Sequence, residues 1–119
     1  MVNEIKIVLH FDSNDQQKFK TLISSLYDII DSLKDSEKDI NVVVNDVGVM
    51  QFLKGNFDKY NLETLKEVMG SDVKIWICSV SLRKYGLSFN DLVDGLLLAS
   101  SGMLKLMEFI KNGYVYLKI

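Results

Sequence analysis

Short apolar runs alternate with helix-like stretches along this chain, and no other feature constrains its fold as strongly. The runs are rich in β-branched and aromatic residues, which favours strands, although 95–99 is also short enough to belong to a helix. Strands that alternate with helices at this spacing favour a mostly parallel sheet covered on both faces. We therefore predict a single α/β domain over residues 1–119. Its five strands are expected at 5–11, 40–45, 74–78, 95–99 and 114–119.

The stretches between the predicted strands have the spacing of amphipathic helices. The longest helix is predicted at 15–33, followed by a polar loop at 35–39. Its apolar residues recur three and four positions apart along one stripe, namely Phe19, Leu22, Ile23, Leu26, Ile29, Ile30 and Leu33. Further helices are predicted at 47–53, 62–69 and 103–111, with short helical turns after Ser79 and over 88–93, where Ser88 and Asp91 form a capping pair. The last helix is expected to turn Leu106, Met107 and Ile110 inward.

Composition and charge exclude several classes of function. The 119 residues carry a net charge of −2, which gives no reason to expect nucleic acid or an anionic membrane as a partner. No apolar run approaches the roughly 18 residues that span a bilayer. The single cysteine cannot form an internal disulfide, so we expect a reducing, cytoplasmic location. With one cysteine, one histidine and no glycine cluster after the first strand, we expect neither a metal site nor a flavodoxin-like phosphate loop, and hence no cofactor.

Polar and reactive residues stand at the ends of the first three predicted strands. The carboxyl ends of parallel strands meet at one edge of a sheet, which is where ligands and chemistry collect in open α/β folds. Residues that are far apart in the sequence are therefore expected to converge there. The pairs at the three strand ends are His10 with Asp12, Asn45 with Asp46, and Cys78 with Ser79.

The lone cysteine is the strongest candidate among these residues. Cys78 ends the third predicted strand directly before a helical turn, and a helix start lowers the pKa of a nearby thiol. Ser79 and Ser81 provide hydroxyls at that helix start, and Arg83 follows one to two turns after the cysteine. The functional interpretation of Cys78 is a thiolate nucleophile or a persulfide carrier, in which case His10 could orient or protonate the attacking thiol.

Each of these residues also has a purely structural interpretation. Free cysteine is among the most buried residue types, and Cys78 could simply fill space in the core. His10 could hydrogen-bond a backbone group at the end of its strand. Cysteine, histidine and asparagine together are also the residue set of a cysteine hydrolase, but such a set occurs by chance in most domains.

The C-terminal third carries more aromatic and thioether surface than a chain of this size can readily bury. This surface comes from Met103, Met107, Phe109, Tyr114 and Tyr116. We expect the last strand to lie at the edge of the sheet, where a second subunit could pair with it, and therefore predict a homo-oligomer. The alternative is a last strand that lies wholly inside its own sheet.

The chain resembles the DsrE/DsrF-like family of small sulfur-relay and related proteins. Three stretches carry the resemblance, and order and spacing are kept over nearly the whole chain. They are Val8-Leu9-His10-Phe11-Asp12, then the run from Ile40 through Asn45 and Asp46 to Val49, and finally Ile77-Cys78-Ser79-Val80-Ser81-Leu82 with Tyr85-Gly86-Leu87, Asp94-Gly95, Ser101-Gly102 and the closing 113–118. The chain departs from the family pattern at Ser79, where a glycine is usual, and at Ser100 and Ile119, where prolines are common.

The resemblance implies a three-layer α/β/α fold around a five-stranded parallel sheet, and assembly into homotrimers or homohexamers. It implies that Cys78 accepts sulfur as a persulfide and passes it from a donor protein to an acceptor protein. The backbone amides of Ser79–Ser81 would then stabilise the thiolate, with His10 and Asn45 supporting it. We therefore predict a cytoplasmic sulfur-relay protein, active if at all as a sulfurtransferase-type carrier. The alternative is a non-enzymatic oligomeric assembly or small-ligand-binding module of the same fold.

Overall fold

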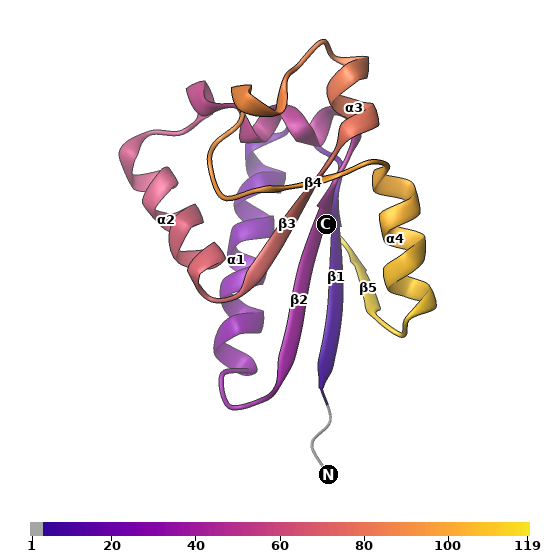
Figure 1. Ribbon diagram of the computed structural model, residues 1–119. Coiled ribbons are helices and arrows are strands. Elements are labelled where there is room, and N and C mark those ends of the chain that lie inside the picture. Colours follow the sequence, from indigo (N-terminus) through magenta and orange to yellow (C-terminus); the bar gives the residue numbers. More distant parts are fainter. Residues whose placement is uncertain (1–3) are drawn as a thin grey trace.

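The computed structural model describes residues 4–119 and contains one five-stranded sheet (Figure 1). Neighbouring strands all run parallel, in the order β4-β3-β2-β1-β5. The predicted five-stranded parallel sheet is therefore confirmed. Its strands are β1 (Ile5–Phe11), β2 (Lys38–Val44), β3 (Val73–Cys78), β4 (Leu97–Ala99) and β5 (Val115–Lys118).

Helices cover both faces of the sheet and give the molecule three layers, as predicted. Helices α1 (Gln16–Ser32) and α2 (Lys59–Gly70) pack on one face, and α4 (Gly102–Lys111) packs on the other (Figure 1). The remaining helices are short: α3 (Ser79–Lys84) and the 3₁₀ segments η1 (Asp46–Phe52), η2 (Lys54–Asn56) and η3 (Phe89–Asp91). Within residues 4–119, no helix combines the length and apolar character that crossing a membrane requires.

Side-chain caps fix where the longer helices begin. The Asp15 carboxylate accepts a hydrogen bond from the Gln17 amide at 3.0 Å at the start of α1. At the start of α2, Asp58 accepts from the Asn61 amide at 2.8 Å. These caps satisfy amides that have no partner inside the helix. The Asp58 cap explains why α2 begins three residues before the predicted helix at 62–69.

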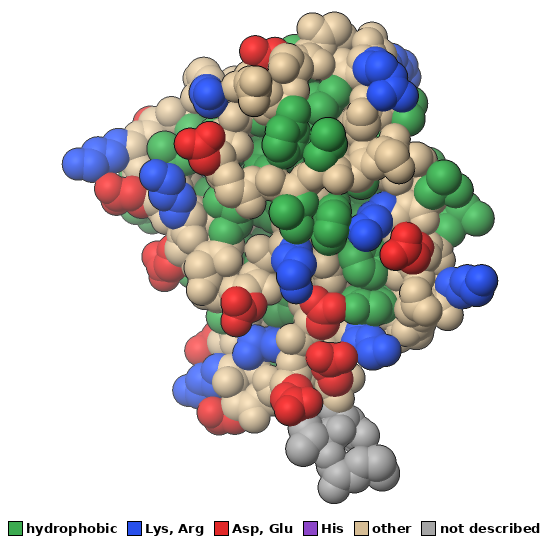
Figure 2. Space-filling view, in the orientation of Figure 1, with side chains coloured by type: hydrophobic (Ala, Val, Ile, Leu, Met, Phe, Trp, Pro, Cys, Tyr) green, Lys and Arg blue, Asp and Glu red, His purple; other side chains and the backbone are tan. Residues whose placement is uncertain are grey.

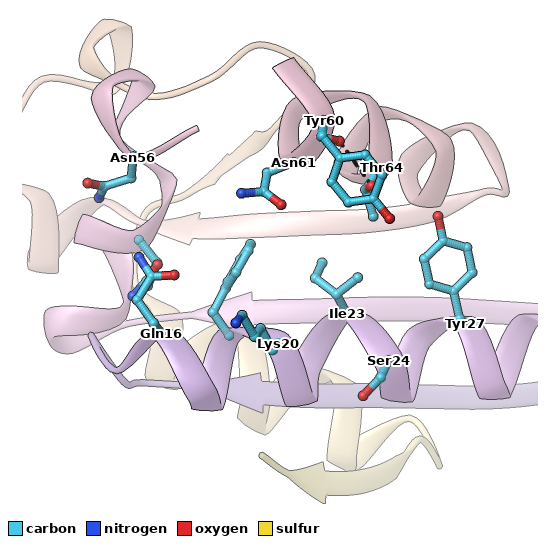
Figure 3. A pocket seen from close by; sticks show the side chains of 11 residues that line it. Gln16, Lys20, Ile23, Ser24, Tyr27, Asn56, Tyr60, Asn61 and Thr64 are labelled. Atoms are coloured by element: carbon cyan, nitrogen blue, oxygen red, sulfur yellow. Dashed lines mark hydrogen bonds between the residues drawn. The ribbon is translucent and has the colours of Figure 1, made fainter. Parts of the chain in front are cut away.

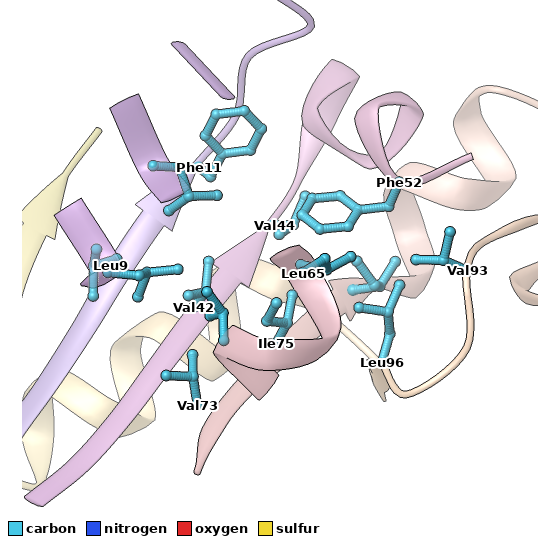
Figure 4. Close-up of a cluster of buried hydrophobic side chains, with 14 of the residues drawn as sticks. Leu9, Phe11, Val42, Val44, Phe52, Leu65, Val73, Ile75, Val93 and Leu96 are labelled. Carbon is cyan, nitrogen blue, oxygen red and sulfur yellow. The ribbon is translucent and has the colours of Figure 1, made fainter. Parts of the chain in front are cut away.

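The main core lies between the sheet and the α1–α2 layer (Figure 4). Phe11, Val42, Phe52 and Ile75 are almost completely buried there. The Phe11 and Phe52 rings meet edge-on, with centroids 6.4 Å apart, which is a favourable aromatic arrangement. The predicted apolar stripe of the first long helix is confirmed, because all seven of its residues belong to this core.

The opposite face of the sheet is covered more thinly, by α4 alone. Its small core consists of Val8, Val43 and Leu106, which are buried. The predicted inner stripe of the last helix is wrong for two of its three residues, because Met107 is 61% exposed and Ile110 is 50% exposed. A single helix on this face can turn only one narrow stripe toward the sheet.

Strand β5 lies at the edge of the sheet, as predicted, because β1 is its only neighbour among the described strands. The alternative, in which the last strand lies inside its own sheet, is therefore wrong. All four residues of β5 are exposed, and α4 leaves much of this edge uncovered. The backbone groups on its outer side are open to pairing.

Several boundaries differ from the prediction for local reasons. Strand β2 begins at Lys38 and not at 40, because Lys38 and Asp39 pair with the start of β1. Strand β4 is shorter than predicted, because Gly95 has a φ of +94° and cannot continue a strand. The predicted helix at 47–53 is the 3₁₀ segment η1. The turn predicted over 88–93 is the 3₁₀ segment η3, and its predicted capping pair, Ser88 and Asp91, is confirmed.

Candidate functional site

The sulfur of Cys78 lies where two helices begin. Cys78 ends β3 and caps α3, and its Sγ accepts a hydrogen bond from the Ser81 amide at 3.4 Å. The amide of Gly102, the first residue of α4, donates to the same sulfur at 3.2 Å. The predicted helix start after the cysteine is present, but the cysteine itself forms the cap and the two serine hydroxyls do not.

These contacts make the Cys78 thiol more acidic than usual. Burial raises the pKa of the thiol, but hydrogen bonds from the Ser81 hydroxyl and from the amides of Ser81, Gly102 and Val80 outweigh it and lower the pKa overall. Donors of this kind stabilise the thiolate more than the thiol. The thiol is therefore activated by neutral donors, not by the neighbouring cation that the position of Arg83 suggested.

The Ser81 hydroxyl is held in the orientation that favours donation to the sulfur. Its Oγ accepts a hydrogen bond from the Asp46 amide at 2.7 Å, and Ser81 is only 6% exposed. With an N–H already directed at the oxygen, the hydroxyl proton is free to point toward Cys78. Ser81 thus connects the loop after β2 to the sulfur at the end of β3.

Asp46 has a strained backbone that the surrounding side chains hold in place. Its φ is +50°, a conformation in which residues other than glycine are uncommon. Its carboxylate accepts hydrogen bonds from the Tyr85 hydroxyl and from Lys84 Nζ, the latter at 3.2 Å. The hydrogen bond from Tyr85 has the larger effect and that from Lys84 the smaller. Together they lower the pKa of Asp46 and favour the ionised carboxylate. Strain retained beside a reactive side chain is often linked to function.

Gly102 is the residue at which α4 comes closest to the cysteine. A Cβ placed on Gly102 would lie 3.0 Å from Cys78 Cβ, 3.2 Å from its Sγ and 3.2 Å from Asn45 Cβ. The absence of a side chain therefore lets the Gly102 amide reach the sulfur. In the sequence, only the Ser101-Gly102 pair of the family resemblance points to this position, and spacing alone does not record its contact with Cys78.

His10 and Asn45 form a hydrogen-bonded chain next to this contact. His10 Nε2 lies 2.8 Å from Asn45 Oδ1, and Nδ1 lies 2.6 Å from the Tyr116 hydroxyl. Because the Asn45 oxygen can only accept, a neutral His10 ring carries its proton on Nε2, and Nδ1 then accepts from the Tyr116 hydroxyl. His10 is therefore bound by two side chains and not by the backbone group considered above. No sequence pattern indicated that Tyr116 belongs to this cluster.

The other two predicted residues lie outside this cluster. The Arg83 guanidinium donates to the Ser79 hydroxyl at 3.0 Å, in an exposed pair on the surface of α3. Neither side chain hydrogen-bonds the sulfur. Asp12 also lies apart, because its carboxylate pairs with Lys118 Nζ at 2.7 Å. The strand ends therefore contribute His10, Asn45 and Cys78 to one cluster.

The sulfur is not open to solvent in the single chain. Cys78 is 4% exposed, whereas the neighbouring Val80 and Met103 are 47% and 58% exposed. A persulfide carrier needs a thiol that its donor can reach, and in this conformation the Cys78 sulfur is covered. Within residues 4–119, no three cysteine, histidine or acidic side chains gather so as to hold a metal ion.

The sequence profile of one protein family matches residues 4–119. The chain belongs to the DsrE/DsrF-like family. This confirms the resemblance seen in the stretches around His10, Asn45 and Cys78, and it extends over nearly the whole chain. No protein with a curated description matches the chain.

Solved structures with the same fold include proteins of unknown function. A protein of unknown function from Methanobacterium thermoautotrophicum has a TM-score of 0.85 at 26% identity, and the match covers 97% of this chain and 99% of that one. The ychN protein from E. coli has a TM-score of 0.74 at 16% identity, and the match covers 97% of this chain and 99% of that one. A conserved protein of unknown function from Bacteroides thetaiotaomicron gives 0.72 at 18% identity, covering 96% and 94%. The last two likenesses establish the fold alone.

Proposed function

We propose that this protein is a cytoplasmic sulfur carrier that holds a persulfide on Cys78. The observation that carries the proposal is the convergence of donors from two helix starts on one thiol, which lowers its pKa. A structural cysteine in an apolar core would have a raised pKa instead. Membership of the DsrE/DsrF-like family supports the same chemistry.

The proposed transfer conserves electrons and needs no cofactor. The Cys78 thiolate attacks the outer sulfur of a donor persulfide, so that a new S–S bond forms at Sγ. The S–S bond of the donor breaks, and its electron pair leaves with the donor thiolate. In the second half, a thiolate of the acceptor attacks the terminal sulfur on Cys78, and the Cys78 thiolate leaves. Its low pKa makes it a good leaving group in this step.

The Ser81 hydroxyl and the amides of Ser81 and Gly102 would stabilise Cys78 whenever it carries negative charge. His10 and Asn45 act as positioning residues. Asn45 packs against Gly102, and His10 fixes the side-chain amide of Asn45 by a hydrogen bond. The donor sulfur must pass the start of α4, which packs against Cys78. We place the opening at Ser100–Gly102, because Ser100 is exposed while Gly102 is buried against the sulfur.

A mass-spectrometric experiment tests the carrier function. Native protein is incubated with sodium tetrasulfide as the sulfur donor, and intact mass is measured without reductant. Wild type is expected to gain the mass of one sulfur atom, which dithiothreitol removes, and Cys78→Ser is expected to gain none. Equal gain by the Cys78→Ser variant, or no gain by folded wild type, would eliminate the carrier proposal.

The burial of Cys78 favours a second candidate function, a non-enzymatic assembly or ligand-binding module whose cysteine only contributes to packing. In that case, iodoacetamide would modify the cysteine only after unfolding. The carrier function instead predicts alkylation of the folded protein, at a rate that follows the thiolate fraction as pH rises. Alkylation in the presence and absence of denaturant therefore separates the two candidates.

We also propose that a second copy of this chain covers α4 and β5. Exposed apolar side chains continue from the helix onto the edge strand, and Figure 2 shows hydrophobic side chains at the surface over α4. Tyr116 lies on the α4 face of the sheet, and Val115 and Leu117 project from the other face of the same edge strand, whose outer backbone groups are unpaired. Exposed apolar groups beside an open strand edge favour a protein partner. The residues are Met103, Leu104, Met107, Ile110, Val115, Tyr116 and Leu117.

Substituting a charge into this surface is expected to separate the subunits. Wild type should elute with a mass of two or more times the 13.6 kDa of one chain in size-exclusion chromatography with light scattering. Met107→Glu should shift the protein to monomer, because it places a charge in the apolar contact. The matched control is Tyr60→Glu on α2, at a position that is 76% exposed, in the helix layer on the other face of the sheet from α4. Monomeric wild type would contradict this part of the proposal.

A further inference from the structure

A separate cavity of about 300 Å³ lies between α1 and α2, on the sheet face opposite Cys78. Its sides are largely apolar and aromatic, with Phe19 and Ile23 from α1. Figure 3 shows Tyr27 and Tyr60 together at one end of the cavity and Gln16 and Asn56 at the other. Its volume is at the lower end of the range for small-molecule sites, which suits a compact ligand.

The polar end of this cavity presents fixed hydrogen-bond acceptors. Gln51, which lines the cavity, donates through Nε2 to the Asn14 carbonyl at 2.9 Å. Asn56 donates through Nδ2 to the Met50 carbonyl at 2.6 Å. Each amide nitrogen therefore donates one hydrogen bond to the backbone, which fixes the orientation of the carboxamide. The oxygens of these two carboxamides accept no hydrogen bond from any residue in the described part of the chain.

Gln51 is the more informative of the two residues because it is only 3% exposed. Every fully buried side-chain oxygen and nitrogen in residues 4–119 has a hydrogen-bond partner. The unpaired Gln51 oxygen therefore keeps some accessible surface. Because Gln51 lines the cavity, this oxygen is accessible to water or to a ligand there. A ligand that covered it without donating to it would leave a buried acceptor unpaired, which is costly, so the position favours a ligand with a hydrogen-bond donor.

The charge of the lining restricts the donor further. Lys20 is the only charged side chain among the residues that line the cavity. Its ammonium group disfavours a cationic ligand, so the lining favours a neutral donor, such as the N–H group of an uncharged ring, over an ammonium group. Flat rings suit the aromatic side chains of the lining, Phe19, Tyr27 and Tyr60, because rings stack or meet edge-on with other rings.

We propose that this cavity binds an uncharged, flat ring compound with an N–H donor on its edge, in the chemical class of lactams and neutral heteroaromatic bases. The N–H group would donate to the Gln51 oxygen while the ring lies among the apolar side chains. This site is independent of the chemistry at Cys78, because it lies on the other side of the sheet.

Two bicyclic probes test the proposal: carbostyril, which is a lactam, and benzimidazole. Each is titrated into ¹⁵N-labelled full-length protein, and binding is followed by the shifts of amide signals, including the side-chain amides of Gln51 and Asn56. Each probe is compared with its N-methyl derivative, which has the same ring but no donor. The parent probes are expected to bind about tenfold more tightly than the methylated forms.

A pair of variants checks the location of the site. Ser24 lines the cavity, and Thr21 lies one turn earlier on α1 outside it. Both are exposed, and both hydroxyls bond a backbone carbonyl of their own helix. Ser24→Trp is expected to fill the opening and weaken binding at least about tenfold, whereas Thr21→Trp leaves it unchanged. No binding of either probe, or equal binding of the methylated forms, would overturn the proposal even if Ser24→Trp failed to fold.

Discussion

Replacing Gly102 by alanine is expected to raise the pKa of the Cys78 thiol and to lower the free energy of unfolding by about 1–3 kcal/mol. The new methyl group would lie 3.0 Å from Cys78 Cβ and 3.2 Å from Asn45 Cβ, and neither atom can rotate away. The start of α4 must therefore move. That movement lengthens the 3.2 Å hydrogen bond from the Gly102 amide to Sγ and weakens the stabilisation of the thiolate.

The Gly102→Ala experiment measures the ultraviolet absorbance of the thiolate against pH, together with denaturant unfolding. Cys78→Ser provides the baseline for the absorbance. Gly70→Ala is the matched control, because Gly70 ends α2 and a Cβ there would meet no atom within 4 Å. The control is expected to keep the thiol pKa and to be equally stable or slightly more so. An unchanged titration in Gly102→Ala would show that the Gly102 amide does not acidify the sulfur.

Ser81→Ala is expected to have a second large effect on the same thiol, again raising its pKa. The Ser81 hydroxyl is first among the donors that lower the pKa of Cys78, and alanine removes it without removing the Ser81 amide. The variant also leaves the Asp46 amide without its partner, which adds a cost in stability of about 1–3 kcal/mol at all pH values. Ser79→Ala is the matched control, because the Ser79 hydroxyl bonds Arg83 and not the sulfur.

The stability of Ser81→Ala relative to wild type should depend on pH. The pKa of Cys78 is lower in the folded protein than in the unfolded chain, so folding favours the thiolate. This contribution is fully present above the pKa of the unfolded thiol and is lost as pH falls through the folded pKa. The stability gap between wild type and variant is therefore expected to widen on the alkaline side. A gap that stays constant in chemical denaturation across this pH range would contradict a hydrogen bond from Ser81 to the thiolate.

The fold was largely predictable because the alternation of strands and helices is a property of local sequence. The stripe from Phe19 to Leu33 and the β-branched runs specify which faces are buried, and the parallel arrangement follows from the helices between them. The convergence of His10, Asn45 and Cys78 followed from the same reasoning about strand ends. These inferences use spacing alone, which the sequence records directly.

The details that set the chemistry depend on packing between distant segments, which spacing does not record. The contact of Gly102 with Cys78 requires α4 to approach β3 closely, and the donation from Ser81 depends on the backbone of Asp46. The burial of the sulfur follows from the same close approach. In α4, the helical period alone placed Met107 and Ile110 inward, although the sheet face has room for little more than Leu106.

The peptide nitrogen of Gly102 has two roles that oppose one another. It belongs to the start of α4, which covers the Cys78 sulfur, and it is also one of the groups that lower the pKa of the Cys78 thiol. Lifting the tip of that helix would admit a bulky reagent and, in the same motion, return the thiol toward its ordinary basicity. Reagent size and nucleophile strength are therefore linked, and the most ionised form of this cysteine is also the most concealed.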